Sequence, residues 1–225
     1  MKYDEMQNKI LVLCSGTGSF EQPFIDAGWE AITVDIDPQH KPTYRVNVNN
    51  IDRDLLRQHG PFKWGHASPD CKLYSIANSS RWHLHWDECK PITREARNSN
   101  RLVENCIEIL EEMCHYWTLE NPRGLLQKQK FMDRHQMGFV TYCQYGDTRI
   151  KPTNIWGKLP ESWAPKSCHY GARCHEASPR GSRQTGTNSL SYTDRIKIPY
   201  GLGDSLRSAG EISAGRSWST LEDWL

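Results

Sequence analysis

The chain has 225 residues, enough for one domain with a substantial core, and its 28 basic and 27 acidic side chains leave a net charge of +1. That balance excludes a histone-like polycation, although a local basic patch is enough to bind nucleic acid. No apolar run approaches the length of a membrane span, and the charged start MKYDEMQNKI predicts no secretory signal. We therefore expect a cytoplasmic protein whose eight cysteines are reduced and serve in the core, in catalysis or in metal binding.

The first sixty residues predict the opening unit of a doubly wound α/β sheet. The apolar run KILVLC (9–14) predicts a strand, SGTG (15–18) a glycine turn, and residues 20–28 a short helix. AITVDID (31–37) predicts a second strand that ends in acid, and 44–48 and 51–58 predict a third strand and a short helix. The fold class expected is α/β with a mostly parallel sheet.

The remaining predicted elements follow the same alternation: a strand at 63–68 leading into SPDC, a helix at 92–114, a strand at 116–119 ending at ENPRG, a strand at 139–143, and order again at 196–206. Residues 157–190 are rich in Ser, Gly, Arg, Pro, Cys and His and lack periodicity. We expect a catalytic domain at 1–156, a small loop-rich insert at 157–190, and a segment at 191–225 that returns to the catalytic domain.

The glycine turn favours a nucleoside ligand. Gly16 and Gly18 let the backbone approach a ligand closely, and Asp35, at the end of the second predicted strand, can hold both hydroxyls of a ribose. The turn lacks the third glycine of a dinucleotide site and the lysine of a P-loop. It therefore favours a nucleoside without a pyrophosphate, such as S-adenosylmethionine, and the alternative is a plain tight turn.

Cys71 and Glu120 both fall just past the ends of predicted strands, at the sheet edge where ligands bind. A thiol there is activated by a nearby cation, and a buried glutamate is costly unless it is paired or used. Taken alone, Cys71 is more often a structural thiol and Glu120 a cap or a surface acid. Their joint placement beside a nucleoside turn favours a catalytic pair.

Six motifs in chain order resemble those of the DNA cytosine-5 methyltransferases, especially the short members encoded by bacteriophages. LVLCSGTGSF and VDID are similar to the first two motifs, and SPDCKLYS to the Pro-Cys-Gln-x-Phe-Ser motif of the nucleophile. ENPRG resembles the Glu-Asn-Val motif, DTRIK (147–151) the Gln-x-Arg-x-Arg motif, and YGLGDS (200–205) the late Gly-Asn-Ser motif. The resemblance implies the Rossmann-like methyltransferase fold, with 157–190 as a small target-recognition insert.

The resemblance also assigns roles. Cys71 would attack C6 of a flipped-out cytosine, Glu120 would bind N3, and Arg149 would orient the base, with Lys151 in the same basic element. S-adenosylmethionine would be held by Ser15, Gly16, Thr17, Gly18, Phe20, Asp35, Ile36, Asn47, Ser68, Asp70, Asp204 and Ser205. Double-stranded DNA would be contacted by Lys72, Ser75, Arg81, Arg173, Arg180, Arg183 and Gln184. The family implies a monomer in a bacterial or phage-infected cell.

The sequence departs from the family at the nucleophile. Asp70 stands where the family has proline, and a carboxylate there disfavours the thiolate unless a cation such as Lys72 neutralises it. Lys151 replaces an arginine and loses its bidentate geometry. Residues 76–97 mix basic and aromatic side chains, which predicts a loop that closes on DNA, the alternative being a solvated helix and loop.

The insert carries the spacing CHxxxxCH at Cys168, His169, Cys174 and His175. Two Cys and two His close together could hold a structural zinc in a lobe too small for its own core. Adjacent Cys-His pairs seldom both bind one ion, so ordinary polar loop residues are the favoured alternative.

Three other functions stay open on the sequence alone. One is an amino-methyltransferase acting on adenine N6 or cytosine N4, because SPDC loosely resembles the Ser-Pro-Pro-Tyr signature. Another is a non-catalytic DNA-binding accessory protein with a methyltransferase fold. The same thiol chemistry also works on RNA cytosine.

Overall fold

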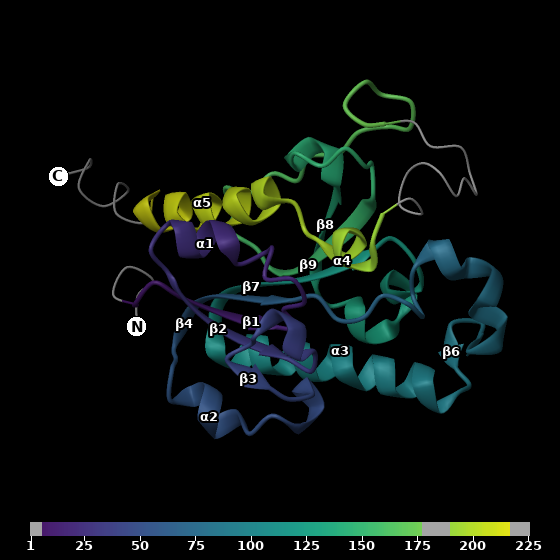
Figure 1. The fold of residues 1–225 in the computed structure, drawn as a ribbon, viewed down its shortest axis with the longest axis horizontal. Helices are drawn as coiled ribbons and strands as arrows, with labels where there is room; N and C mark the ends of the chain where they lie inside the picture. The colour runs from purple at the N-terminus through teal and green to yellow at the C-terminus, as the bar shows by residue number, and fades with distance from the viewer. Residues whose placement is uncertain (1–5, 177–189, 217–225) are drawn as a thin grey trace.

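A seven-stranded sheet organises the structure, a computed structural model that describes residues 6–176 and 190–216 (Figure 1). Its strand order is β3-β2-β1-β4-β7-β9-β8. The strands are β1 (Lys9–Leu13), β2 (Glu30–Asp35), β3 (Tyr44–Arg45), β4 (Phe62–Ala67), β7 (Cys114–Pro122), β8 (Gln136–Thr141) and β9 (Pro152–Lys158).

The sheet is mostly parallel. β1 pairs in parallel with both β2 and β4, β2 with β3, and β4 with β7, whereas β9 runs antiparallel between β7 and β8. The chain builds outward from β1 to β3 and then returns to place β4 on the other side of β1. That reversal makes the carboxyl ends of β1 and β4 the topological switch point, where open α/β sheets bind ligands. The predicted doubly wound α/β class is confirmed.

Helices cover both faces of the sheet (Figure 1). α1 (Gln22–Asp26) and α5 (Tyr200–Arg216) lie together on one face, and α2 (Arg53–Arg57) and α3 (Arg94–Met113) lie on the other. The shorter elements are α4 (Tyr192–Ile196), the hairpin of β5 (Trp86–Asp87) and β6 (Lys90–Pro91), and the 3-10 turns η2 (Pro38–His40), η3 (Val48–Asn50), η4 (Ile76–Leu84), η5 (Leu125–Lys128), η6 (Lys130–Met132) and η7 (Tyr142–Tyr145). None of the helices within the described ranges is both long and apolar enough to span a membrane.

The core divides into two layers because strand side chains alternate between the faces. On β1, Leu11 and Leu13 belong to the cluster packed under α3, and Ile10 and Val12 to the cluster packed under α1 and α5. All four are fully buried, as expected of a parallel strand covered on both sides. This double burial fixes the carboxyl ends of β1, β4 and β7 as a rigid platform.

Three segments differ from the sequence expectations. β9 runs to Lys158, two residues past the expected domain boundary at 156, and its mixed composition behind Pro152 did not predict a strand. The helix α5 replaces the loosely defined order expected at 196–206. Residues 76–97 form η4, the β5–β6 hairpin and the start of α3, and Trp86 is buried beside Tyr74 and donates to the carbonyl of Leu73 at 3.1 Å.

Candidate active site

The loops after β4 and β7 are joined at the carboxyl edge of the sheet. Asn121 Nδ2 donates to the carbonyl oxygen of Pro69 at 3.0 Å, and the amide of Leu125 donates to that of Tyr74 at 2.8 Å. The backbones approach so closely that a Cβ on Gly124 would lie 2.0 Å from the carbonyl oxygen of Tyr74. Glycine is therefore required at 124, and the two predicted motifs SPDCKLYS and ENPRG form one rigid unit.

Glu120 is a buried carboxylate held from two sides. Its side chain sits on β7 and only 3% of the residue is exposed. Ser68 Oγ donates to Oε2 at 2.7 Å, and Tyr142 Oη donates to Oε1 at 2.7 Å. Each oxygen keeps a further lone pair, so the carboxyl is oriented and can still accept from a ligand.

Cys71 is a partly buried thiol in the same unit. Its pKa is raised to about 11, mainly by burial and also by the Glu120 carboxylate and Asp70, while the Lys151 ammonium acts to lower it. At neutral pH the side chain is therefore a thiol.

Asp70 is exposed, and its Oδ1 accepts from the backbone amide of Lys72 at 2.9 Å. The expected neutralising charge of Lys72 is replaced by that of Lys151, whose positive charge acts directly on the thiol. Lys151 lies over the ring of Tyr142, with Nζ 4.4 Å from the centroid, and donates to the carbonyl of Arg195 at 3.3 Å. Burial lowers the pKa of Lys151, and Glu120 and Cys71 oppose that shift.

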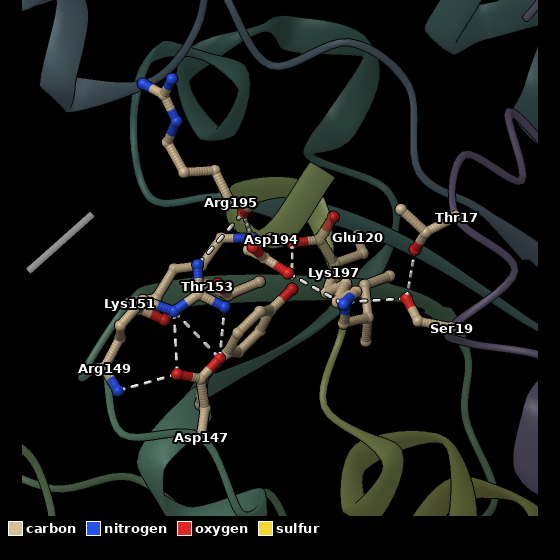
Figure 2. Close-up of polar contacts among 12 residues, drawn as sticks. Thr17, Ser19, Glu120, Asp147, Arg149, Lys151, Thr153, Asp194, Arg195 and Lys197 are labelled. Carbon is tan, nitrogen blue, oxygen red and sulfur yellow. Dashed lines mark hydrogen bonds and ion pairs between the residues drawn. The ribbon is translucent and has the colours of Figure 1, made fainter. Parts of the chain in front are cut away.

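Arg149 is paired with Asp147, the first residue of the same motif (Figure 2). Its Nε donates to both carboxylate oxygens, at 2.8 and 3.1 Å, and Nη1 donates to the carbonyl of Arg195 at 3.3 Å. The Arg149 side chain is thus engaged by the protein, and Lys151 is the cation whose charge reaches Glu120 and Cys71.

The glycine turn closes onto the acid at the end of β2. The amide of Gly16 donates to Asp35 Oδ2 at 2.8 Å, and the amide of Asp37 donates to Oδ1 at 2.7 Å. Gly16 and Gly18 both have positive φ, +52° and +74°, which favours glycine. Asp35 is thereby fixed with its remaining lone pairs free for a polyhydroxyl ligand, and the side chain of Ile36 beside it is 65% exposed.

Glu21 is a second buried acid beside this turn. It is 3% exposed, its Oε1 would lie 3.5 Å from a Cβ on Gly18, and its Oε2 has no hydrogen-bond partner among the described residues. Burial raises the pKa of Glu21 to about 7, with a smaller contribution from Asp35. An unpartnered buried acceptor next to a nucleoside turn is suited to a ligand donor such as an ammonium group.

Phe20, expected at the cofactor, is buried in the core and stacks on His66, with ring centroids 3.4 Å apart. His66 Nδ1 lies 2.9 Å from Thr118 Oγ1, and burial lowers the pKa of the ring to about 3. The two stacked rings are uncharged and pack in the core next to the glycine turn.

The helix α4 crosses the edge of the sheet above the site. Ile196 lies 3.8 Å from the Cβ position of Gly16, and the amide of Ile198 donates to Ser19 Oγ at 2.9 Å. Ser19 also accepts from Thr17 Oγ1 at 2.9 Å. Tyr192 on α4 is 68% exposed, and its pKa is raised by partial burial and by the charges of Asp70, Cys71, Asp37 and Asp35. α4 therefore links the glycine turn to the Cys71 side of the edge.

The other predicted cofactor residues lie at several places. Asn47 caps η3 by accepting from the amide of Asn49 at 2.9 Å. On α5, Asp204 accepts from Arg207 at 2.7 Å and Ser205 accepts from Trp163 Nε1 at 3.3 Å, so these contacts lead away from the glycine turn. The late motif approaches the turn through Gly203, where a Cβ would lie 2.6 Å from the carbonyl oxygen of Phe20.

Of the residues expected to contact DNA, Lys72, Arg81 and Arg173 are exposed. Ser75 caps η4 and pairs with Gly124 across the joined loops. Arg180, Arg183 and Gln184 lie outside the described residues.

Three of the four candidate zinc ligands gather in space. Cys168, Cys174 and His175 lie with Cys143, and the ligand atoms of the four are all within 4.8 Å of one another. His169 is exposed and is not one of this group.

No protein-family model and no curated protein matches the chain. Several solved structures, however, are similar to it. One is described as a DNA modification methyltransferase encoded within an E. coli prophage, at 14% identity and a TM-score of 0.49 over 72% of this chain and 51% of that one. Another is the S. pombe Dnmt2 methyltransferase, at 13% identity and a TM-score of 0.45 over 67% of this chain and 48% of that one. A Spodoptera frugiperda DNMT2 mutant has 15% identity and a TM-score of 0.47 over 72% of this chain and 53% of that one. The chain spans about half the length of these structures.

Sequence reasoning missed Tyr142, Glu21 and Cys143. Tyr142 does lie at the end of a predicted strand, where a polar side chain reaches the binding edge, and that position was the available signal. Nothing local marks Glu21 or Cys143, because their importance comes from burial and from partners distant in sequence.

Proposed function

We propose that this chain transfers a methyl group from S-adenosylmethionine to carbon 5 of cytosine in DNA. The observation that carries the proposal is the pair of Cys71 and Glu120. A thiol and an oriented, buried carboxyl occupy the carboxyl ends of the neighbouring strands β4 and β7, and the carboxylate raises the pKa of the thiol.

The glycine turn fits the cofactor. Asp35, held by two backbone amides, would accept the ribose hydroxyls, and the exposed Ile36 would meet the adenine. The unpartnered Oε2 of Glu21 would accept from the α-ammonium group of the methionine part. Bound there, S-adenosylmethionine supplies the methyl group as an electrophile on its sulfonium.

Cytosine C5 is too weak a nucleophile to take that methyl group unaided. Addition of the Cys71 sulfur to C6 forms a carbon–sulfur bond and turns the ring into an enamine, which makes C5 nucleophilic. C5 would then take the methyl group as its bond to the sulfonium breaks, leaving S-adenosylhomocysteine. Transfer of the C5 proton to a base and cleavage of the same carbon–sulfur bond return the free cysteine and the aromatic ring. A stacked base cannot be reached in this way, so the cytosine must leave the duplex.

Glu120 stabilises the ring during attack. A carboxyl fixed by Ser68 and Tyr142 against N3 meets the charge that develops there and needs no reorganisation at the moment of reaction. A proton taken up from solvent as the base binds, and shared between Glu120 and N3, reduces the negative charge facing Cys71. That lowers the pKa of the thiol when the correct base is present, so the nucleophile is activated by its own substrate.

Lys151 holds the thiolate formed in this way. Its ammonium is buried near both Glu120 and Cys71, and the carbonyl of Arg195 on α4 fixes its direction. Arg149, joined to Asp147, would orient the base or a phosphate only after exchanging that partner, so we assign the electrostatic role to Lys151.

The test is to identify the modified nucleoside. The full chain is incubated with S-adenosylmethionine carrying an isotopically labelled methyl group, with duplex DNA or with RNA, and the digested nucleosides are separated by mass. We expect labelled 5-methylcytosine from DNA with the wild-type chain and none with Cys71→Ala. Labelled N4-methylcytosine or N6-methyladenine would replace the proposal with an amino-methyltransferase, label confined to RNA would change the substrate, and DNA binding without transfer would indicate an accessory protein.

A further inference from the structure

Four soft or borderline ligand atoms converge where the insert meets the turn η7. Cys143 Sγ lies 3.2 Å from Cys168 Sγ and 3.7 Å from Cys174 Sγ. His175 Nδ1 lies 3.6 Å from Cys168 Sγ and 3.7 Å from Cys174 Sγ. The four residues come from positions up to 32 apart in sequence (175 − 143), and their ligand atoms all lie within 4.8 Å of one another.

Three of these four spacings match the edges of a metal tetrahedron, and the 3.2 Å between the sulfurs of Cys143 and Cys168 is shorter than such an edge. Zinc–sulfur bonds of about 2.3 Å and zinc–nitrogen bonds of about 2.0–2.1 Å place ligand atoms about 3.8 Å (S···S) and about 3.5 Å (S···N) apart. The cysteines are free, and the 3.2 Å between the sulfurs of Cys143 and Cys168 is far longer than a disulfide bond of about 2.05 Å. We propose that Cys143, Cys168, Cys174 and His175 form a closed, structural zinc site.

The segment that carries three of the ligands has no core of its own. Between residues 164 and 176 no residue is buried, and Tyr170 is 68% exposed. A few backbone contacts attach it: the amide of Thr141 donates to the carbonyl of Lys166 at 3.2 Å, and that of Glu176 to the carbonyl of Thr148 at 2.9 Å. A segment that buries so little apolar surface needs another source of stability, and a bound metal supplies it directly.

The surroundings order two of the cysteine ligands. Thr141 Oγ1 accepts from the amide of Cys168 at 2.9 Å and lies 3.6 Å from Cys143 Sγ, so one hydroxyl orders two ligands. With His175 bound through Nδ1, its proton stays on Nε2, which is buried and has no hydrogen-bond partner in the described part of the chain. Binding releases the three thiol protons to solvent, so the site tightens as pH rises.

The site joins the insert to the catalytic edge through two consecutive residues. Tyr142 directs its hydroxyl to Glu120, and Cys143, the next residue in η7, directs its sulfur to the cluster. The zinc therefore has a positioning role: it holds η7 and the segment 166–176 together without touching the reacting atoms. This inference does not depend on the reaction proposed above.

The test measures metal in the purified full chain. We expect about one zinc per chain by elemental analysis, and cobalt exchanged into the site should show the intense absorption of a tetrahedral thiolate complex. His175→Ala and Cys143→Ala should lose the metal, whereas His169→Ala, next to a ligand in sequence but outside the cluster, should keep it. Thiol titration of the native wild-type chain should find three protected cysteines that react once a chelator is added.

Three results would overturn the inference. One is a metal-free wild-type chain, purified from zinc-supplemented cells, that binds neither added zinc nor cobalt. The second is a mass lower by two hydrogen atoms with Cys143 linked to Cys168, which would make the cluster a disulfide. The third is metal retained in Cys143→Ala but lost in His169→Ala, which would assign the ion to the CHxxxxCH spacing alone. Because the wild-type chain answers the first two, a variant that fails to fold cannot obscure the outcome.

Discussion

The sheet edge that carries Cys71 and Glu120 is held in place by different means from the insert segment 164–176. At the edge, Glu120 and Asn121 are almost completely buried, Asn121 on β7 anchors the loop after β4, and the two core clusters pack against the sheet. The segment buries no residue and is attached by backbone contacts and the four ligand atoms of the proposed zinc site. The two regions meet at Tyr142 and Cys143.

The two regions therefore differ in how precisely their side chains are placed. Apolar burial fixes the edge to the accuracy that covalent chemistry requires, because a packed core has few alternative arrangements. A metal site fixes one point of a surface segment and leaves the rest of its side chains free to contact a partner. The core thus supports the proposed site at the edge, and the proposed zinc ion attaches the exposed segment.

The largest expected effect lies at the edge. Glu120→Gln should lower methyl transfer on the order of 10²–10³-fold, as the loss of an oriented electrostatic partner does. The same change removes the negative charge that raises the pKa of Cys71, so alkylation of Cys71 by iodoacetamide at fixed pH should become faster. The matched control is Glu111→Gln on the surface of α3, which should change neither. If Glu120→Gln lowers both the methyl-transfer rate and the alkylation rate of Cys71, then Glu120 acts by stabilising the fold.

A pair of glycines compares the two regions directly. A Cβ on Gly124 would lie 2.0 Å from a backbone oxygen, so Gly124→Ala should lower the free energy of unfolding by about 2–4 kcal/mol. Gly171, in the insert segment, has a φ of +86° with open space around its Cβ position, so Gly171→Ala should cost only about 1 kcal/mol. Chemical denaturation of both variants measures this, and equal losses would contradict the contrast in packing.

Glu21 gives a pH-dependent effect of up to about 3 kcal/mol. Its pKa is raised from 4.5 to about 7, so between these values the folded chain keeps a proton that the unfolded chain has released. Stability from this group is therefore lost as pH rises through about 7. Glu21→Gln removes the titration, so its stability relative to wild type should increase from pH 4.5 to 7 and then level off. A constant difference across that range would show that Glu21 is not buried as an acid.

The same variant tests the proposed cofactor contact. By removing the carboxylate offered to the α-ammonium group, Glu21→Gln should weaken binding of S-adenosylhomocysteine about tenfold, measured by calorimetry at pH 8. Asp26→Gln, on the exposed end of α1, is the control and should bind as wild type. Unchanged binding would place the ammonium group elsewhere while leaving the stability prediction intact.

The smallest expected effect tests whether the insert segment opens independently of the sheet edge. Chelation of the proposed metal should speed tryptic cleavage at Lys166 and Arg173 by about tenfold, because the segment opens locally. Hydrogen exchange of β4 and β7 should stay as it was. Loss of protection in those strands on chelation would mean that the metal supports the whole fold.

The sequence predicted the features that depend on residues close together in the chain. Apolar runs gave β1, β4 and β7, and because parallel strands end at a common edge, Cys71 and Glu120 were expected together. It failed where partners are distant. Lys72 was the expected neutralising cation because it is adjacent to Cys71, but Lys151 reaches the thiol across the sheet. Likewise His169 could not be told from His175, and Cys143 was not considered, because only the folded chain brings η7 to the insert.

The central claim is that Cys71 forms a covalent bond with cytosine, and trapping that bond tests it most directly. Fluorine at C5 cannot leave as a cation, so a duplex containing 5-fluorocytosine should stop the reaction after addition and methyl transfer. With S-adenosylmethionine present, we expect a detergent-stable protein–DNA adduct from the wild-type chain and from Cys89→Ala, and none from Cys71→Ala. Methyl transfer to ordinary DNA without any adduct, or an adduct that persists in Cys71→Ala, would contradict the account.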